Sequence, residues 1–434
     1  MTHYPETSVF FRKLRWEYPR ITHGKGSWVY DDTGDAYLDA CGGAFVSNLG
    51  HGVTEIADAM AAQAKKLAYV SGMTLTHDAV EAFAEELVKL TPVDLDKVYP
   101  LSSGSDAVEA ALKLARQYWA ELGTPSKQKI VALSPSYHGN TLLALSASAR
   151  EHYKSMYKGW LVDVIRVPAY DADALAAAIE RAGPETIAAF IMEPVGGSST
   201  GALVPPSGYL ARVRAICDEQ RVLFIADEIL CGAGRTGTWS ALEPDDITPD
   251  LLILGKGIAA GFAPLAAVVA PTGIVDAFAE GSGALNHAQT FSHHAVSCAA
   301  GTATLRYLAQ HKLVERCAMM GKTLHARLAQ LGDLPSVGAI RGRGLLAGIE
   351  LVEDVSSDTP FPRSAHFAET LTRTALDARL IVWPNIGHRN GADGAGDLIM
   401  LAPPFTVTTE EIDTIVERLG DAITQTVKHL SVRT

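Results

Sequence analysis

The sequence predicts an α/β fold built around a mostly parallel β-sheet, and two patterns support this prediction. Between residues 97 and 270, short apolar runs typical of strands alternate with segments of helical periodicity. Polar clusters follow five of the apolar runs. In such sheets ligands bind at the carboxyl ends of the strands. The patterns therefore predict a fold class and the position of a binding site.

The predicted elements follow in chain order. Residues 21–40 alternate around turn residues like small antiparallel strands. Strands of the main sheet are predicted at 97–101, 130–133, 187–192, 222–226, 251–254 and 265–270, with helices at 106–121, 172–182 and 208–220. A strand at 344–351, a helix near 364–378, a glycine-rich loop at 391–396 and a helix from about Thr409 follow. We expect a large domain at 71–329, and a smaller α+β domain formed by both chain ends, 1–70 and 330–434.

Composition and charge bear on location and partners. The net charge of −12 argues against general binding to nucleic acids or anionic membranes. No apolar stretch approaches the roughly 18 residues of a membrane span, and the first residues lack the pattern of a signal peptide. Five scattered cysteines without a CxxC pair fit free thiols in a reducing compartment. We therefore expect a cytoplasmic protein that binds neither nucleic acids nor membranes.

Lys256 is the most informative residue of the chain. It follows the apolar run 251–254, which is typical of a buried strand. Burial disfavours the charged ammonium, lowers its pKa and makes the neutral amine available as a nucleophile. The apolar run 222–226 is followed by a carboxylate, Asp227. Pyridoxal phosphate requires a lysine for its Schiff base and an acidic partner for its pyridine nitrogen, so this pair suggests that cofactor.

The segment Ser103-Gly104-Ser105 precedes an amphipathic helix, in which Asp106 and Glu109 have the spacing of a capping box. Small residues at a helix start allow backbone N–H groups to approach a phosphate. An ordinary capped helix has the same pattern, so both interpretations stay open.

Two other strand ends carry groups that suit a cofactor site. Tyr137 and His138 follow the strand at 130–133, and a tyrosine there either stacks on a flat heterocycle or lines a loop. Glu193 follows the strand at 187–192 and either orients other groups or caps a neighbouring helix.

Other cofactors agree less well with the sequence. His293 and His294 are adjacent, and neighbouring residues rarely bind one metal ion together, so we expect no metal site. No Gly-Lys-Ser/Thr follows residues 103–105, which excludes a P-loop there. A nicotinamide-dependent dehydrogenase is disfavoured, because no strand–GxGxxG–helix unit with an acidic residue about 20 positions later is present.

In chain order, the motifs resemble those of class III (omega) aminotransferases, which are pyridoxal phosphate enzymes of fold type I. The motifs are SSGSDAVEAALKLAR from residue 102, YHGNT from 137, EP from 193, DEILCGAGRTG from 227, LGKG from 254, TFSHH from 290 and RGRGLLAGIEL from 341. The resemblance extends from Gly24 to Phe405 and implies a large domain with a mostly parallel seven-stranded sheet.

The resemblance also implies roles for individual residues. Lys256 would form the Schiff base, and Asp227 would pair with the pyridine nitrogen. The cofactor phosphate would lie against Ser103, Gly104 and Ser105.

The remaining cofactor-binding residues follow from the same resemblance. Tyr137 and Ile229 would pack on opposite faces of the ring, with His138 in the same set, and Glu193 would support the hydroxyl edge. Thr290 would reach the cofactor phosphate of a second subunit. This last role implies a homodimer, or a higher homo-oligomer, with shared active sites.

Departures from the family pattern bear on the substrate. Many relatives that use ornithine or acetylornithine have an arginine three residues before the Pro-Pro pair, where this chain has Met400. The amine:pyruvate branch instead uses a mobile arginine on the preceding loop, for which Arg389 is the candidate; a plain surface arginine is the alternative. Phe45 occupies a position where that branch often has an aromatic residue in the substrate pocket. The family's Gly-His-Pro is replaced by residues 293–295, His-His-Ala.

The predicted function is the transfer of an amino group from an amine or omega-amino acid to a keto acid, with pyruvate favoured, by a ping-pong mechanism. The same scaffold leaves alternatives open. One is an enzyme of the 4-aminobutyrate or diamine type that uses 2-oxoglutarate. Another is a non-transaminating aminomutase or decarboxylase.

Overall fold

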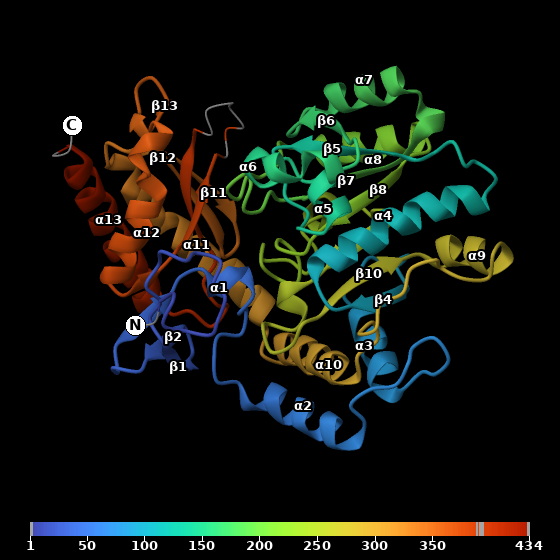
Figure 1. The fold of residues 1–434 in the computed structure, drawn as a ribbon, viewed down its shortest axis with the longest axis horizontal. Coiled ribbons are helices and arrows are strands. Elements are labelled where there is room, and N and C mark those ends of the chain that lie inside the picture. Colours follow the sequence, from blue (N-terminus) through green and yellow to red (C-terminus); the bar gives the residue numbers. More distant parts are fainter. Residues whose placement is uncertain (1–2, 388, 390–394, 432–434) are drawn as a thin grey trace.

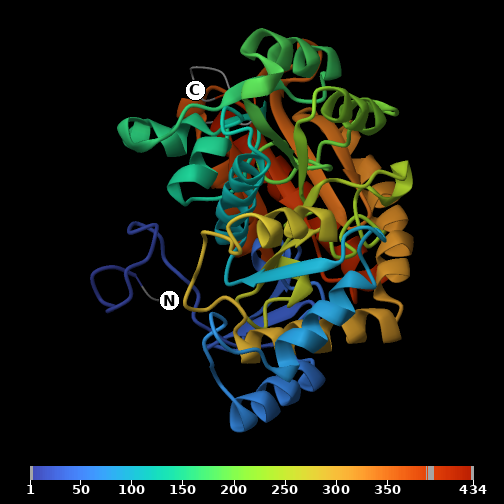
Figure 2. The ribbon, with the colours of Figure 1, turned by 90° about the vertical axis from the view of Figure 1, so that its right-hand side faces the viewer.

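The computed structural model describes residues 3–387, 389 and 395–431 (Figure 1). Residues 391–394 of the predicted glycine-rich loop lie outside this part of the chain. The segments near the two chain ends, blue and red in Figure 1, occupy one side of the molecule, and the middle of the chain occupies the other. Figure 2 shows the N-terminal segment before residue 21 extending from the body of the molecule.

The central sheet has seven strands and confirms the predicted α/β class. Its order is β4 (Lys97–Leu101), β10 (Ala266–Ala270), β9 (Leu251–Leu254), β8 (Leu223–Asp227), β7 (Ile187–Met192), β5 (Lys129–Ser134) and β6 (Ile165–Pro168). Only β10 runs antiparallel to its neighbours in this sheet. Sequence reasoning missed β6, an edge strand that contains an arginine and a proline in place of an apolar run.

Both faces of this sheet are buried, which explains its nearly continuous apolar strands. Phe190 and Phe224 point to one face and Ile191 and Ile225 to the other, because successive side chains in a strand alternate. The first face packs against α3 (Asp78–Val88), α7 (Ala172–Ala182), α8 (Tyr209–Glu219) and α10 (Ala295–Gln310). The second packs against α4 (Gly104–Glu121), α5 (Leu142–Ala147) and α9 (Thr272–Glu280).

Strand pairing joins the two ends of the chain. β1 (Ile21–Lys25), β2 (Trp28–Asp31) and β3 (Ala36–Asp39) form a sheet whose fourth strand is β14 (Leu380–Ile381). A second sheet consists of β11 (Val337–Arg343), β12 (Leu346–Asp354), β16 (Asp397–Leu401) and β15 (Trp383–Ile386), with β13 (Thr359–Pro360) paired to β12. The helices α11 (Leu313–Leu328), α12 (Phe367–Asp377) and α13 (Thr409–Ser431) share a core with these sheets. The domain boundaries at 70/71 and 329/330 stay a prediction.

The remaining α-helices are α1 (Gly42–Phe45), α2 (Thr54–Lys66) and α6 (Glu151–Lys154). None of the helices in the described ranges is both long and apolar enough to cross a bilayer. All five cysteines are buried and unpaired.

Candidate functional site

A cavity of about 190 Å³ lies at the carboxyl ends of β8 and β9. Its lining contains every predicted cofactor-binding residue except Thr290, together with two residues that the sequence did not single out. The lining residues are Ser103, Gly104, Ser105, Tyr137, His138, Gly139, Glu193, Asp227, Ile229, Leu230 and Lys256. The structure thus brings together residues from five separate strand ends.

Lys256 follows β9 with its backbone in the left-handed region, at φ 44°. Burial lowers the pKa of its ammonium group, while the nearby Asp227 and Glu193 carboxyls oppose this shift. The Nζ atom lies 5.7 Å from the centroid of the Phe45 ring. The next residue, Gly257, has no room for a side chain, because a Cβ there would collide with the side-chain amide of Asn48.

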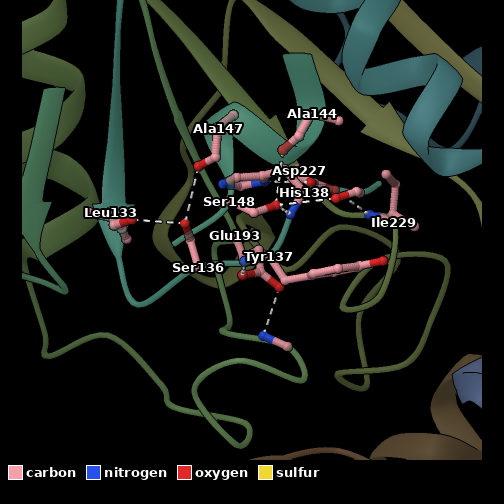
Figure 3. Close-up of polar contacts among 12 residues, drawn as sticks. Leu133, Ser136, Tyr137, His138, Ala144, Ala147, Ser148, Glu193, Asp227 and Ile229 are labelled. Atoms are coloured by element: carbon pink, nitrogen blue, oxygen red, sulfur yellow. Dashed lines mark hydrogen bonds and ion pairs between the residues drawn. The ribbon is translucent and has the colours of Figure 1, made fainter. Parts of the chain in front are cut away.

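Asp227 is the last residue of β8 and is 3% exposed. Its Oδ2 atom lies 2.7 Å from Nδ1 of His138, and its Oδ1 accepts a hydrogen bond from the backbone N–H of Ile229 (Figure 3). The backbone N–H of His138 donates to the Ser148 hydroxyl at 2.8 Å. Sequence reasoning missed Ser148, which lies after α5 and has no motif around it. These contacts fix the carboxylate at the cavity.

Glu193, which lines the cavity, connects the loop that follows β5 with the loop that follows β7. Its Oε2 accepts a hydrogen bond from the backbone N–H of Tyr137 at 3.0 Å, and its Oε1 accepts one from the N–H of Gly197 at 2.9 Å. Burial raises the pKa of this carboxyl. The half-buried Tyr137 ring lies beside Glu193 in Figure 3, and its hydroxyl accepts a hydrogen bond from Asn140. The hydrogen bond from its backbone to Glu193 therefore positions Tyr137 at the cavity.

The start of α4 differs in detail from the prediction. Ser103 is the N-cap: its hydroxyl oxygen accepts a hydrogen bond from the N–H of Asp106, and the hydroxyl donates to the Asp106 carboxylate at 2.7 Å. The predicted capping box of Asp106 and Glu109 was wrong, because the helix begins earlier than expected. Ser105 accepts from the N–H of Asn140, and a Cβ at Gly139 would lie 2.5 Å from the Ser105 hydroxyl oxygen.

Ile229 packs against the same helix start. A Cβ added to Gly104 would lie 3.0 Å from its Cδ1 atom, and one added to Gly255 would lie 3.2 Å from its Cγ2 atom. The side chain therefore fills the space between the beginning of α4 and the end of β9.

The predicted substrate residue Phe45 lies close to Lys256, at the end of α1. It is 3% exposed, and its ring centroid lies 5.2 Å from that of Trp383 on β15. Met400 is buried in the same apolar cluster. At position 400 this chain thus has an apolar side chain in the cluster that contains Phe45.

Arg389 has other partners in this structure. Its guanidinium donates to the Glu350 carboxylate at 2.7 Å and to the Asp358 carboxylate at 2.6 Å. It is not among the residues that line the cavity. A role in substrate binding would require release from both carboxylates, and that role stays a prediction.

The segment that contains Thr290, His293 and His294 does not line the cavity of its own chain. Thr290 is exposed, so the proposed contact with a second subunit stays a prediction. His294 is the N-cap of α10 and accepts from the N–H of Ser297, and the carbonyl oxygen of His293 lies 2.8 Å from Nε2 of His77. Within the described ranges, no group of three or more His, Cys, Asp or Glu side chains is placed to hold a metal ion.

Comparisons with known proteins agree with this geometry. Residues 15–423 match the family model of class III aminotransferases. The uncharacterized aminotransferase YodT of Bacillus subtilis is 35% identical over 95% of this chain and 96% of its own. Ornithine aminotransferase 1 of Staphylococcus aureus is 37% identical, covering 92% of this chain and 93% of its own.

Solved structures give the same result. The thermostable (S)-enantioselective omega-transaminase of Thermomicrobium roseum superposes with a TM-score of 0.90 at 32% identity, covering 98% of this chain and 96% of the other. An omega-transaminase of Pseudomonas jessenii, solved in complex with PMP, has a TM-score of 0.88 at 30% identity. The match covers 95% of this chain and 94% of the other. The predicted fold of this family is therefore confirmed, and the chain belongs to the class III aminotransferases.

Proposed function

We propose that this chain is a pyridoxal-phosphate-dependent omega-aminotransferase that transfers an amino group from an amine or omega-amino acid to pyruvate by a ping-pong mechanism. The observation that carries the proposal is the convergence of a half-buried lysine, a buried aspartate and a helix start on one cavity. Five buried, unpaired cysteines support a reducing compartment such as the cytoplasm. The exposed Thr290 is consistent with a homo-oligomer in which it faces a second subunit.

The residues present fit the cofactor. Gly104 and Ser105 at the start of α4 line the cavity, and the first backbone N–H groups of a helix, which have no partner within the helix, suit a phosphate. The Asp227 carboxylate is held by His138 and is suited to a protonated pyridine nitrogen. Lys256 supplies the amine for covalent attachment.

When bound, pyridoxal phosphate supplies an electron sink for the carbanion formed at the substrate carbon. Lys256 would then move the proton between the substrate carbon and the cofactor, for which a neutral amine is required. Burial already lowers the pKa of Lys256 and so favours the neutral form. Tyr137 would keep the ring in place by stacking, and Glu193 would hold Tyr137.

The apolar Met400 supports pyruvate over an acceptor with two carboxylates. Where an arginine would suit a second carboxylate, this chain has a buried thioether in the cluster that contains Phe45. The omega-transaminases of Thermomicrobium roseum and Pseudomonas jessenii are also similar over nearly their whole length. Activity with 2-oxoglutarate alone would instead favour the 4-aminobutyrate or diamine type.

A panel of amine and omega-amino acid donors, each assayed with pyruvate and with 2-oxoglutarate, tests the proposal. We expect stoichiometric transfer to pyruvate without release of carbon dioxide. Lys256→Ala should abolish turnover and the absorbance of the covalently bound cofactor, whereas Lys129→Ala, at the exposed start of β5, should behave as wild type. An active Lys256→Ala protein would contradict the assignment.

A further inference from the structure

Arg150 is a buried cation for which the described residues provide no acidic partner. It lies between α5 and α6 and is 8% exposed. Its guanidinium donates one hydrogen bond, to the side-chain oxygen of Asn385 on β15, and lies 4.9 Å from the centroid of the Tyr153 ring. Among the described residues no carboxylate lies within ion-pair distance of it. Burial lowers the pKa of this group, as expected for a cation removed from water.

Two other arginines, the buried Arg235 and the half-buried Arg166, are bonded more completely. Arg235 donates to two backbone carbonyls and to Asn48. Arg166 donates to the carbonyl oxygens at the end of α5. A buried charge is costly unless it is paired or fully hydrogen-bonded, so Arg150 has capacity for another acceptor.

The neighbouring amide provides a second, independent observation. Asn385 is 2% exposed, and its Nδ2 donor has no hydrogen-bond partner in the described structure. Its Oδ1 already accepts from Arg150. Buried side-chain donors are rarely left unpaired, and those that are often indicate a bound group. The guanidinium and the amide together offer donors that an anion could accept.

Hydrogen bonds connect the residues just before Arg150 to the cavity wall. The backbone N–H of His138, which lines the cavity, donates to the Ser148 hydroxyl at 2.8 Å, and the N–H of Ala149 donates to the carbonyl oxygen of Ser136 at 3.0 Å. Arg12 of the N-terminal segment lies over the same tyrosine ring as Arg150, with its guanidinium 5.2 Å from the Tyr153 ring centroid. The Glu193 carboxylate is already bonded to the N–H groups of two loops. Two guanidinium groups, those of Arg150 and Arg12, therefore lie over the Tyr153 ring.

We propose that Arg150 and Asn385 form the subsite that binds the substrate carboxylate. This inference rests on the proposed function and assigns a specificity-determining role to a fixed arginine rather than to Arg389. A guanidinium can bind a carboxylate through two parallel hydrogen bonds, which gives orientation as well as affinity. The carboxylate would supply the missing counterion, and its second oxygen would accept from Nδ2 of Asn385.

Separate half-reactions test this subsite. The aminated enzyme is reacted with pyruvate, and the aldehyde form of the enzyme is reacted with 1-phenylethylamine, which has no carboxylate. Arg150→Gln should raise the KM for pyruvate about 10- to 100-fold, the loss expected for a charge-assisted hydrogen bond. The rate constant at saturation and the reaction with 1-phenylethylamine should stay within about 3-fold of wild type. Arg389→Gln distinguishes this fixed arginine from the loop candidate. Arg327→Gln, which removes an exposed ion pair with Asp413, is the matched control and should leave the KM for pyruvate unchanged.

Asn385→Asp tests the subsite without removing the arginine. The new carboxylate would pair with Arg150 and compete with the substrate, so the KM for pyruvate should rise while the thermal unfolding midpoint is kept or raised. A folded Asn385→Asp protein with wild-type KM would overturn the inference. So would a KM that rises only in Arg389→Gln, or an equal loss with 1-phenylethylamine.

A binding measurement separates this inference from the proposed function. Propanoate, an unreactive carboxylate, should raise the thermal unfolding midpoint of the wild-type protein and have no effect on Asn385→Asp. A wild-type protein that transfers no amino group to any keto acid would contradict the proposed function. Equal stabilisation of both proteins by propanoate would contradict the subsite.

Discussion

At the scale of single residues, the charge state of Lys256 depends on Asp227. The lysine backbone is in the left-handed region, which costs a residue with a Cβ about 1 kcal/mol. Such strain persists only where the surroundings determine the conformation, and it is most frequent at functional sites. Burial and Asp227 act in opposite directions on the pKa of Lys256. Asp227 therefore has two proposed roles, one toward the lysine and one toward the cofactor.

Asp227→Asn should reduce turnover by about 100-fold or more, because an amide cannot keep a pyridine nitrogen protonated as a carboxylate does. The change is isosteric, so the protein should fold and the decrease should appear in kcat. The measurement is steady-state kinetics with pyruvate, together with the absorbance of the bound cofactor. Asp218→Asn, which removes an exposed partner of Arg214, should retain wild-type turnover. Wild-type kcat in Asp227→Asn would refute the proposed pairing.

At the scale of elements, the loop after β8 is held by a second carboxyl. Glu228 is fully buried and accepts hydrogen bonds from the Ser240 hydroxyl and from the backbone N–H groups of Ala241 and Leu242. A Cβ at Gly232 would lie 2.8 Å from the Glu228 carboxylate. The carboxyl thus determines where the chain turns after Asp227.

The Glu228 carboxyl predicts a pH dependence of stability. Burial raises its pKa from 4.5 to about 7. Between these values the folded protein holds a proton that the unfolded chain has released, so folding stability falls as the pH rises. Relative to Glu228→Gln, the wild type should lose up to about 3 kcal/mol of unfolding free energy between about pH 5 and pH 8. Thermal unfolding of both proteins across this range measures the difference.

A stability difference between wild type and Glu228→Gln that is independent of pH would exclude the pKa shift. Glu219→Gln, at the exposed end of α8, should follow the wild-type profile.

Elements with strong periodicity were predictable from the sequence, and contacts between distant elements were not. Strands such as β7 are buried on both faces and are continuous apolar runs. β6 lies at an edge, so it lacks that signal. Most of the cavity lining could be predicted because polar residues follow the strands directly. Ser148 and Asn385 reach the site region only through tertiary packing, and no local pattern identifies them.

At the scale of the whole molecule, Arg235 joins three distant parts of the chain. Its guanidinium donates to the carbonyl oxygens of Leu345 and Pro403 and to the side-chain oxygen of Asn48. It also lies 4.7 Å from the centroid of the Phe405 ring. Burial lowers its pKa to about 10, so it stays charged at neutral pH. The segment that follows Asp227 is thereby fixed to the region formed by the chain ends.

Arg235→Leu should therefore destabilise the whole molecule. The substitution fills part of the volume but leaves three buried acceptors without donors, and each such group costs about 1–3 kcal/mol. We expect a loss of about 3 kcal/mol or more in unfolding free energy, measured by urea unfolding at neutral pH. Arg327→Leu removes an exposed ion pair with Asp413 and should cost less than about 1 kcal/mol. Equal, small losses in the two variants would mean that Arg235 does not hold the chain ends to the central sheet. A large loss confined to Arg235→Leu would show that the position of the loop after Asp227 depends on contacts made more than a hundred residues away in sequence.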